Sequence, residues 1–171
     1  GVMFGATGVS GGAKIYSSGG NVNVAGRTFV TSGTISVFAV GVIFMAESDI
    51  HAGLGKILVE GNNATASATA GNYRYPLEWN AWGLNKTSQF TSTNADDDSI
   101  TMRAVETVAS NGLHINTGGA EFKNPNGGLL IQTNRFMDSV MSTVNVGGPF
   151  VFEPVDTSFA ATYTFDNDIT W

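Results

Sequence analysis

The sequence has no cysteine, two histidines and only 13% charged residues. The absence of cysteine excludes disulfides, thiolate zinc sites, iron–sulfur clusters and cysteine nucleophiles. Lys and Arg number 8 against 14 Asp and Glu, which gives a formal net charge of −6. A protein that binds nucleic acid needs a basic surface to displace counterions from phosphates, so this balance argues against nucleic acid as a partner.

Long hydrophobic runs are also missing. The most apolar run covers 13 residues, 34–46, whereas a helix needs ~20 residues to cross a bilayer. No basic segment precedes an apolar one at the amino end, so we expect neither a signal peptide nor a membrane partner. The first residue is Gly1 rather than Met, which leaves the compartment open at this stage.

Glycine, by contrast, is abundant, with 22 among 171 residues. Glycine is concentrated near the amino end. Because glycine loses more conformational entropy on ordering than any other residue, such a segment is costly to order. We therefore predict a Gly-rich extended N-terminal arm over residues 1–26, followed by a single all-β domain over residues 27–171. Such an arm is either a flexible terminus or a segment that becomes ordered against a neighbouring subunit.

From Arg27 onward, short runs of β-branched and aromatic residues alternate with turn clusters every 8–14 residues. This spacing is typical of an antiparallel β-sandwich or barrel with little helix. The pair Asn111-Gly112 predicts a type I′ hairpin, because that turn needs positive φ at both central residues. Residues 98–110 fit either a helix or a strand, and their Thr and Val content favours the strand. No repeat of fixed period is visible. The expected strands cover residues 27–31, 34–45, 56–60, 73–79, 88–92, 100–109, 113–116, 120–123, 129–133, 140–146, 150–153 and 159–166.

The expected strand over residues 34–45 is apolar on both faces, whereas a strand of a small antiparallel domain normally has one wet face. The second face must then be covered by the same chain or by another subunit, and this favours a homo-oligomer. One face carries Ile35, Val37, Ala39, Ile43 and Met45, and the other carries Phe38, Val40, Val42 and Phe44.

No motif predicts catalysis, a cofactor or a metal. The glycines of Gly5-Ala-Thr-Gly-Val-Ser-Gly11 resemble a dinucleotide-binding loop, but neither the required strand before it nor the helix after it is present. No Gly-x-Ser-x-Gly turn accompanies His51 or His114, so we expect no enzyme. The acidic runs 96–98 and 166–168 fit solvated turns better than calcium loops.

Aromatic residues are densest at Tyr73, Tyr75, Trp79 and Trp82. Such a cluster serves most often as core or as an interface anchor, where Trp and Tyr are enriched. It could also stack on sugar rings, and this leaves a glycan as a possible partner.

Two short stretches, Asn23-Val-Ala-Gly-Arg-Thr-Phe29 and Tyr163-Thr-Phe-Asp-Asn-Asp-Ile-Thr-Trp171, resemble parts of the tail-tube subunits of tailed bacteriophages. The Cys-free, Lys-poor composition is similar to that of structural proteins of tailed-phage virions in general, and the glycine-rich arm resembles the arms of capsid decoration (cement) proteins. The resemblance implies a non-enzymatic, self-assembling structural protein of a virion. Its partners would be further copies of itself and other virion or surface proteins.

Assembly of this kind would depend on apolar anchors at subunit interfaces. An extracellular, pilus-like fibre or adhesin module is the main alternative, and a carbohydrate-binding β-sandwich that uses the Tyr73–Trp82 cluster is another. The expected interface residues are Val2, Met3, Phe4, Ile15, Tyr16, Phe38, Val40, Val42, Phe44, Trp79 and Trp82.

Overall fold

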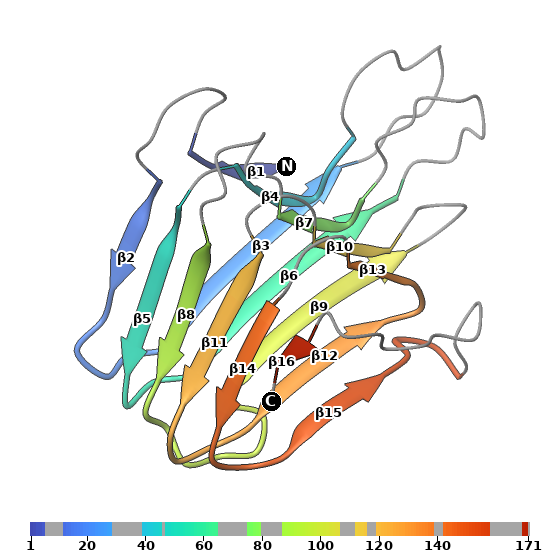
Figure 1. Cartoon of the computed structure of the whole chain (residues 1–171). Helices are drawn as coiled ribbons and strands as arrows, with labels where there is room; N and C mark the ends of the chain where they lie inside the picture. The colour runs from blue at the N-terminus through green and yellow to red at the C-terminus, as the bar shows by residue number, and fades with distance from the viewer. Residues whose placement is uncertain are drawn as a thin grey trace.

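The fold is all-β, with sixteen strands in three sheets and no helix in the part of the chain that the computed structural model describes (Figure 1). None of the described segments is a helix that could cross a membrane. The described residues are 1–5, 12–28, 39–45, 47–64, 75–79, 87–106, 112–115, 119–138, 142–157 and 169–170.

The three sheets, here named A, B and C, are parallel throughout. Sheet A contains β1 (Val2–Phe4), β4 (Val42–Phe44), β7 (Leu77–Trp79), β10 (Leu113–Ile115) and β13 (Phe136–Asp138). Sheet B contains β2 (Lys14–Tyr16), β5 (Asp49–Gly53), β8 (Ser88–Ser92), β11 (Ala120–Asn124), β14 (Ser142–Val146) and β16 (Ile169–Thr170). Sheet C contains β3 (Val22–Thr28), β6 (Ile57–Asn63), β9 (Ile100–Glu106), β12 (Leu129–Thr133) and β15 (Phe150–Glu153).

The order of the strands describes a parallel β-helix. The chain contributes one strand to sheet A, one to sheet B and one to sheet C, and then begins the next turn beside the previous one (Figure 1). Five such turns are complete, and β16 adds one further strand to sheet B. Each interior strand therefore pairs with the equivalent strands of the turns before and after it.

The prediction of an antiparallel sandwich or barrel was wrong. Several strands lie where the sequence placed them, including β8, β12 and β15, but their pairing is different. The turn clusters do not reverse the chain into a hairpin. They bend it around a corner into the next sheet, so the partner of a strand lies a full turn away.

The described strands on either side of Asn111-Gly112 do not form the expected hairpin, for the same reason, and Asn111 itself lies outside the described residues. β9 belongs to sheet C and β10 to sheet A, and β10 pairs with β7 and β13 instead. Gly112 has φ of +78°, and a Cβ placed on it would lie 2.0 Å from the carbonyl oxygen of Arg135. Glycine is thus required here by a close backbone approach at a corner. The strand interpretation of residues 98–110 is confirmed from Ile100 to Glu106.

The residues expected to form an extended arm supply the first turn of the β-helix. β1, β2 and most of β3 lie within residues 1–26, and they pair in register with β4, β5 and β6. The expected domain boundary after Gly26 lies inside β3.

Turn length varies, which explains why no sequence repeat is visible. The successive partners of Val2 in sheet A are Val42, Leu77, Leu113 and Phe136. The turns they mark span 40, 35, 36 and 23 residues. The repeat is therefore one of shape, without a fixed period.

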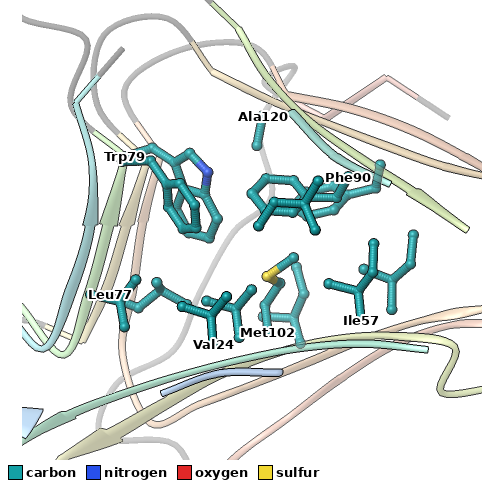
Figure 2. Packing of buried hydrophobic residues seen from close by; sticks show 14 of the residues in the cluster. Val24, Ile57, Leu77, Trp79, Phe90, Met102 and Ala120 are labelled. Atoms are coloured by element: carbon teal, nitrogen blue, oxygen red, sulfur yellow. The ribbon is translucent and has the colours of Figure 1, made fainter. Parts of the chain in front are cut away.

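Rows of identical or similar side chains fill the interior between the sheets (Figure 2). In sheet A, Phe4 stacks on Phe44 with ring centroids 4.8 Å apart, and Phe44 stacks on Trp79 at 5.3 Å. In sheet B, Phe90 stacks on Phe122 at 5.4 Å. The two rows meet edge to face, a favourable geometry for aromatic rings.

Buried Asn124 joins the corners of successive turns. Its amide nitrogen donates to the carbonyl oxygen of Asn94 at 2.8 Å, and its amide oxygen accepts the N–H groups of Asn126 and Gly127 at 3.0 Å each. The side chain thus satisfies backbone groups that a buried corner would otherwise leave unpaired.

Burial of both faces is confirmed for the described part of the apolar strand, and the cover comes from this chain. Val42 and Phe44 lie in the main core, whereas Ile43 lies on the opposite face. There Ile43 packs in a second buried cluster with Val40, Met45 and Tyr75. Phe38 lies outside the described residues.

Candidate assembly site at the first turn

The first turn of the β-helix presents a free edge in all three sheets. β1, β2 and β3 are each the outermost strand of their sheet (Figure 1). The N–H groups of Val2 and Val22 donate to the second turn, at Gly41 and Lys56, with N–O distances of 2.8 Å. In a parallel ladder the backbone groups of alternate residues point to opposite sides. Within each of the three edge strands, every second residue therefore points its N–H and C=O groups away from the second turn.

These outward-directed backbone groups belong to Met3, Lys14, Tyr16, Asn23 and Ala25. No described strand pairs with them. Unpaired strand edges are templates for another strand, and natural proteins cover or pair them. Solenoid proteins face this problem at each end and need either a cap or a further repeat.

Apolar side chains at the free edge are less covered than their partners one turn further in. Val2 and Ile15 are partly buried, whereas their register partners Val42 and Ile50 are fully buried. Phe4 remains 9% exposed, against 1% for Phe44. The edge therefore combines unpaired backbone with incompletely buried core residues.

At the other end of the β-helix, the last turn supplies the outermost described strand of two sheets. β13 and β15 are outermost in sheets A and C, whereas β16 pairs with the first two residues of β14. Phe136, Phe150 and Phe152 are only partly buried here, and the rings of Phe136 and Phe152 meet edge to face at 5.5 Å.

The two ends carry opposite charge. Residues 1–28 contain Lys14 and Arg27 and no acidic residue. Residues 136–157 contain Asp138, Glu153 and Asp156 and neither Lys nor Arg. The first turn of one copy should therefore attract the last turn of another copy, whereas two first turns or two last turns should repel each other.

The expected interface residues fall into three groups. Val2, Met3, Phe4, Ile15 and Tyr16 lie together in the first turn, where Met3 and Tyr16 are 61% and 60% exposed. Another four, Val40, Val42, Phe44 and Trp79, are buried inside this chain. Phe38 and Trp82 lie outside the described residues.

The aromatic cluster is divided in the same way. The rings of Trp79 and Tyr75 are buried, the first in the main core and the second against His114. Tyr73 and Trp82 lie outside the described residues. Neither described member presents a ring face on the surface for a sugar.

A buried ionisable cluster on the outer face of sheet A was not expected. Glu78 is fully buried, and its Oε1 lies 3.4 Å from Nδ1 of His114, whose ring stacks on Tyr75 with centroids 4.4 Å apart. Glu78 and His114 are register partners on β7 and β10. Because 35 residues separate them in the chain, only the parallel register brings them together. No group of three or more metal-ligating side chains lies among the residues with a described position.

The stability of the fold should depend on pH through Glu106, which lies at the end of β9. Burial and the nearby Asp156 carboxylate raise the pKa of Glu106 to about 7, against the opposing effect of Arg135. The unfolded chain has a Glu pKa of about 4.3, so ionisation opposes folding increasingly as the pH rises from about 4.3 through 7. Glu106→Gln removes this charge. The difference in stability between the variant and the wild type should therefore favour the variant more at pH 8 than at pH 5. Thermal unfolding at both pH values measures the difference, and parallel profiles for the two proteins would contradict the assignment.

Comparison with known proteins found no matching family model, no matching curated protein and no matching solved structure.

Proposed function

We propose that this chain is a non-enzymatic structural protein that assembles head to tail into a β-helical filament. The observation that carries the proposal is the pair of complementary ends. Among the described strands, the first turn supplies the outermost strand of every sheet, partly exposed apolar residues and positive charge, and the last turn supplies the outermost strands of sheets A and C, partly buried phenylalanines and negative charge.

Head-to-tail contact is the arrangement that keeps every strand parallel. If β15 of one copy lay beside β3 of the next, Phe150 would take the same position relative to Val22 as Val22 takes relative to Ile57. Such a contact uses two different surfaces, and it forms an open filament when its rotation does not close a ring. In sheet B, β16 pairs with the first two residues of β14, so this short strand would have to move aside for the β2 of the next copy to lie beside β14.

The setting we propose for this filament is a virion, as the resemblance to phage structural proteins implies. A cell-surface fibre is the alternative setting, and the assembly mechanism would be the same. In both, interaction with further copies and with other virion or surface proteins takes place through the ends.

The experiment changes one backbone donor on the free edge. The N–H of Ala25 points away from β6, and the Ala25 side chain is exposed. Ala25→Pro removes that donor at a position where an edge strand tolerates proline. Ala25→Ser is the matched control, because it changes the side chain and keeps the N–H.

Analytical ultracentrifugation and negative-stain electron microscopy over a concentration series measure assembly. We expect the wild type and Ala25→Ser to form concentration-dependent filaments and Ala25→Pro to remain largely monomeric, with little change in thermal unfolding of the monomer. A wild type that stays monomeric throughout the series would overturn the proposal. Filaments of Ala25→Pro equal to those of the wild type would do the same.

A further inference from the structure

Sheet C carries a groove on its outer face, whereas the assembly proposal uses the backbone edge of this sheet. The groove has a cavity volume of about 290 Å³ and crosses β3, β6, β9 and β12. This volume is near the lower limit for ligand sites, so the groove suits a short stretch of a longer molecule. We propose that it binds a neutral oligosaccharide lying across the strands.

The floor of the groove is a cross-strand row. Asn23, Leu58, Thr101 and Leu130 are successive register partners, so their side chains lie side by side on the outer face. Leu58 and Leu130 are partly exposed there. The two leucines, which alternate with Asn23 and Thr101, match the C–H face of a pyranose ring, which loses little by leaving water.

The sides of the groove carry hydrogen-bonding groups. Arg103 and Gln132 lie side by side in the next row, and Lys56 lies at the opposite side with Asp98. Guanidinium and ammonium groups donate, a carboxylate accepts, and an amide does both. Sugar hydroxyl groups donate and accept as well, so a ring lying on the floor would meet partners along both of its edges.

The charges in the groove favour a neutral ligand. Lys56 is paired with Asp96 at 2.8 Å and Asp98 at 2.7 Å, and these carboxylates raise the pKa of Lys56. Arg103 is paired with Glu60 at 3.2 Å. With both cations neutralised and a net charge of −6 on the chain, a polyanion such as nucleic acid gains little here.

An extended peptide is also disfavoured. A peptide strand binds by adding to the edge of a sheet, where its backbone finds partners. The groove lies on a face of sheet C, between strands whose backbone groups are already paired within the ladder. Along the β-helix axis, the side chains within one row repeat at about 4.8 Å, the distance between neighbouring strands. This spacing is close to the length of one hexose unit, so a polymer of sugars meets similar positions at successive strands.

The test uses an array of immobilised neutral gluco-, manno-, galacto- and xylo-oligosaccharides, beside uronic acid and sulfated chains. We expect the full chain to bind at least one neutral series. Titration calorimetry with the soluble form of that oligosaccharide should then show binding about threefold to tenfold weaker for Gln132→Ala, because one hydrogen bond is lost. Leu58→Asn should weaken binding through loss of the apolar floor.

Gln89→Ala is the matched control. Gln89 is a partly buried glutamine on β8 in sheet B and donates to Glu121 at 2.8 Å, as Gln132 donates to Glu153 at 2.7 Å. We expect this control to bind as the wild type does. Three results would overturn the proposal: no binding to any neutral chain, binding to acidic chains alone, or equal binding by Gln132→Ala, Leu58→Asn and the control.

Discussion

Replacing Phe90 with alanine should lower the free energy of unfolding by about 3–5 kcal/mol, the usual cost of removing a buried phenylalanine ring. Phe90 is fully buried, and its ring stacks on Phe122 at 5.4 Å. It also meets Phe44 and Trp79 edge to face, with centroids 5.3 and 5.7 Å away. The ring therefore joins the aromatic row of sheet B to that of sheet A (Figure 2), and its loss would leave a cavity at their junction.

Urea denaturation followed by circular dichroism measures this effect, with Phe152→Ala as the comparison. Phe152 lies in the last turn and is only partly buried, and its ring meets that of Phe136 edge to face. Its replacement should cost clearly less than that of Phe90, because less area leaves water in the folded state. An equal loss in the two variants would contradict the central place of the Phe90 ring.

Gly61→Ala should also destabilise the fold, by about 1–3 kcal/mol or more. A Cβ at Gly61 would lie 1.8 Å from the carbonyl oxygen of Pro76, which is backbone and cannot rotate away. Gly26, the register partner of Gly61 in β3, is in the same position, with a Cβ 2.1 Å from the carbonyl oxygen of Gly41. The two glycines let the chain pass close to sheet C where it turns toward sheet A.

Gly20→Ala is the control for this substitution. A Cβ at Gly20 would meet only the hydroxyl oxygen of Ser17, at 3.2 Å, and this oxygen, which accepts the N–H of Gly20 at 2.9 Å, needs to shift only slightly. Alanine at such a site restricts the unfolded chain and leaves stability nearly unchanged or slightly higher. Thermal unfolding of the two variants distinguishes the sites, and similar melting temperatures would show that the approach at Gly61 relaxes at little cost.

The proposed filament and the proposed glycan groove share β3, where the backbone of Asn23 lies at the sheet edge and its side chain lies in the groove. Assembly uses the free edges of the first and last turns, whereas the groove uses the outer face of sheet C. Filament formation would place many grooves along one axis, which raises the apparent affinity for a polymer without any new contact. The variants Ala25→Pro and Gln132→Ala therefore test the two proposals separately.

Local sequence determined the strands and the all-β class. The runs at residues 88–92, 129–133 and 150–153 contain the β-branched or aromatic residues typical of strands, and glycine, asparagine and proline occur between the runs. The absence of cysteine and the acidic net charge can likewise be read directly from the sequence. The expected interface residues between Val2 and Tyr16 are close in the sequence, and they also lie together in the first turn of the structure.

Tertiary structure alone decided which strands pair and in which direction. The same turn residues can reverse a chain into a hairpin or bend it around a corner, and nothing local to Asn111-Gly112 distinguishes the two. Turns of 40, 35, 36 and 23 residues conceal the repeat, so Glu78 and His114, or Leu58 and Thr101, become neighbours only once the parallel register exists. The free edge and the groove follow from that register, because both are made of residues that lie far apart in the chain and are joined by backbone ladders.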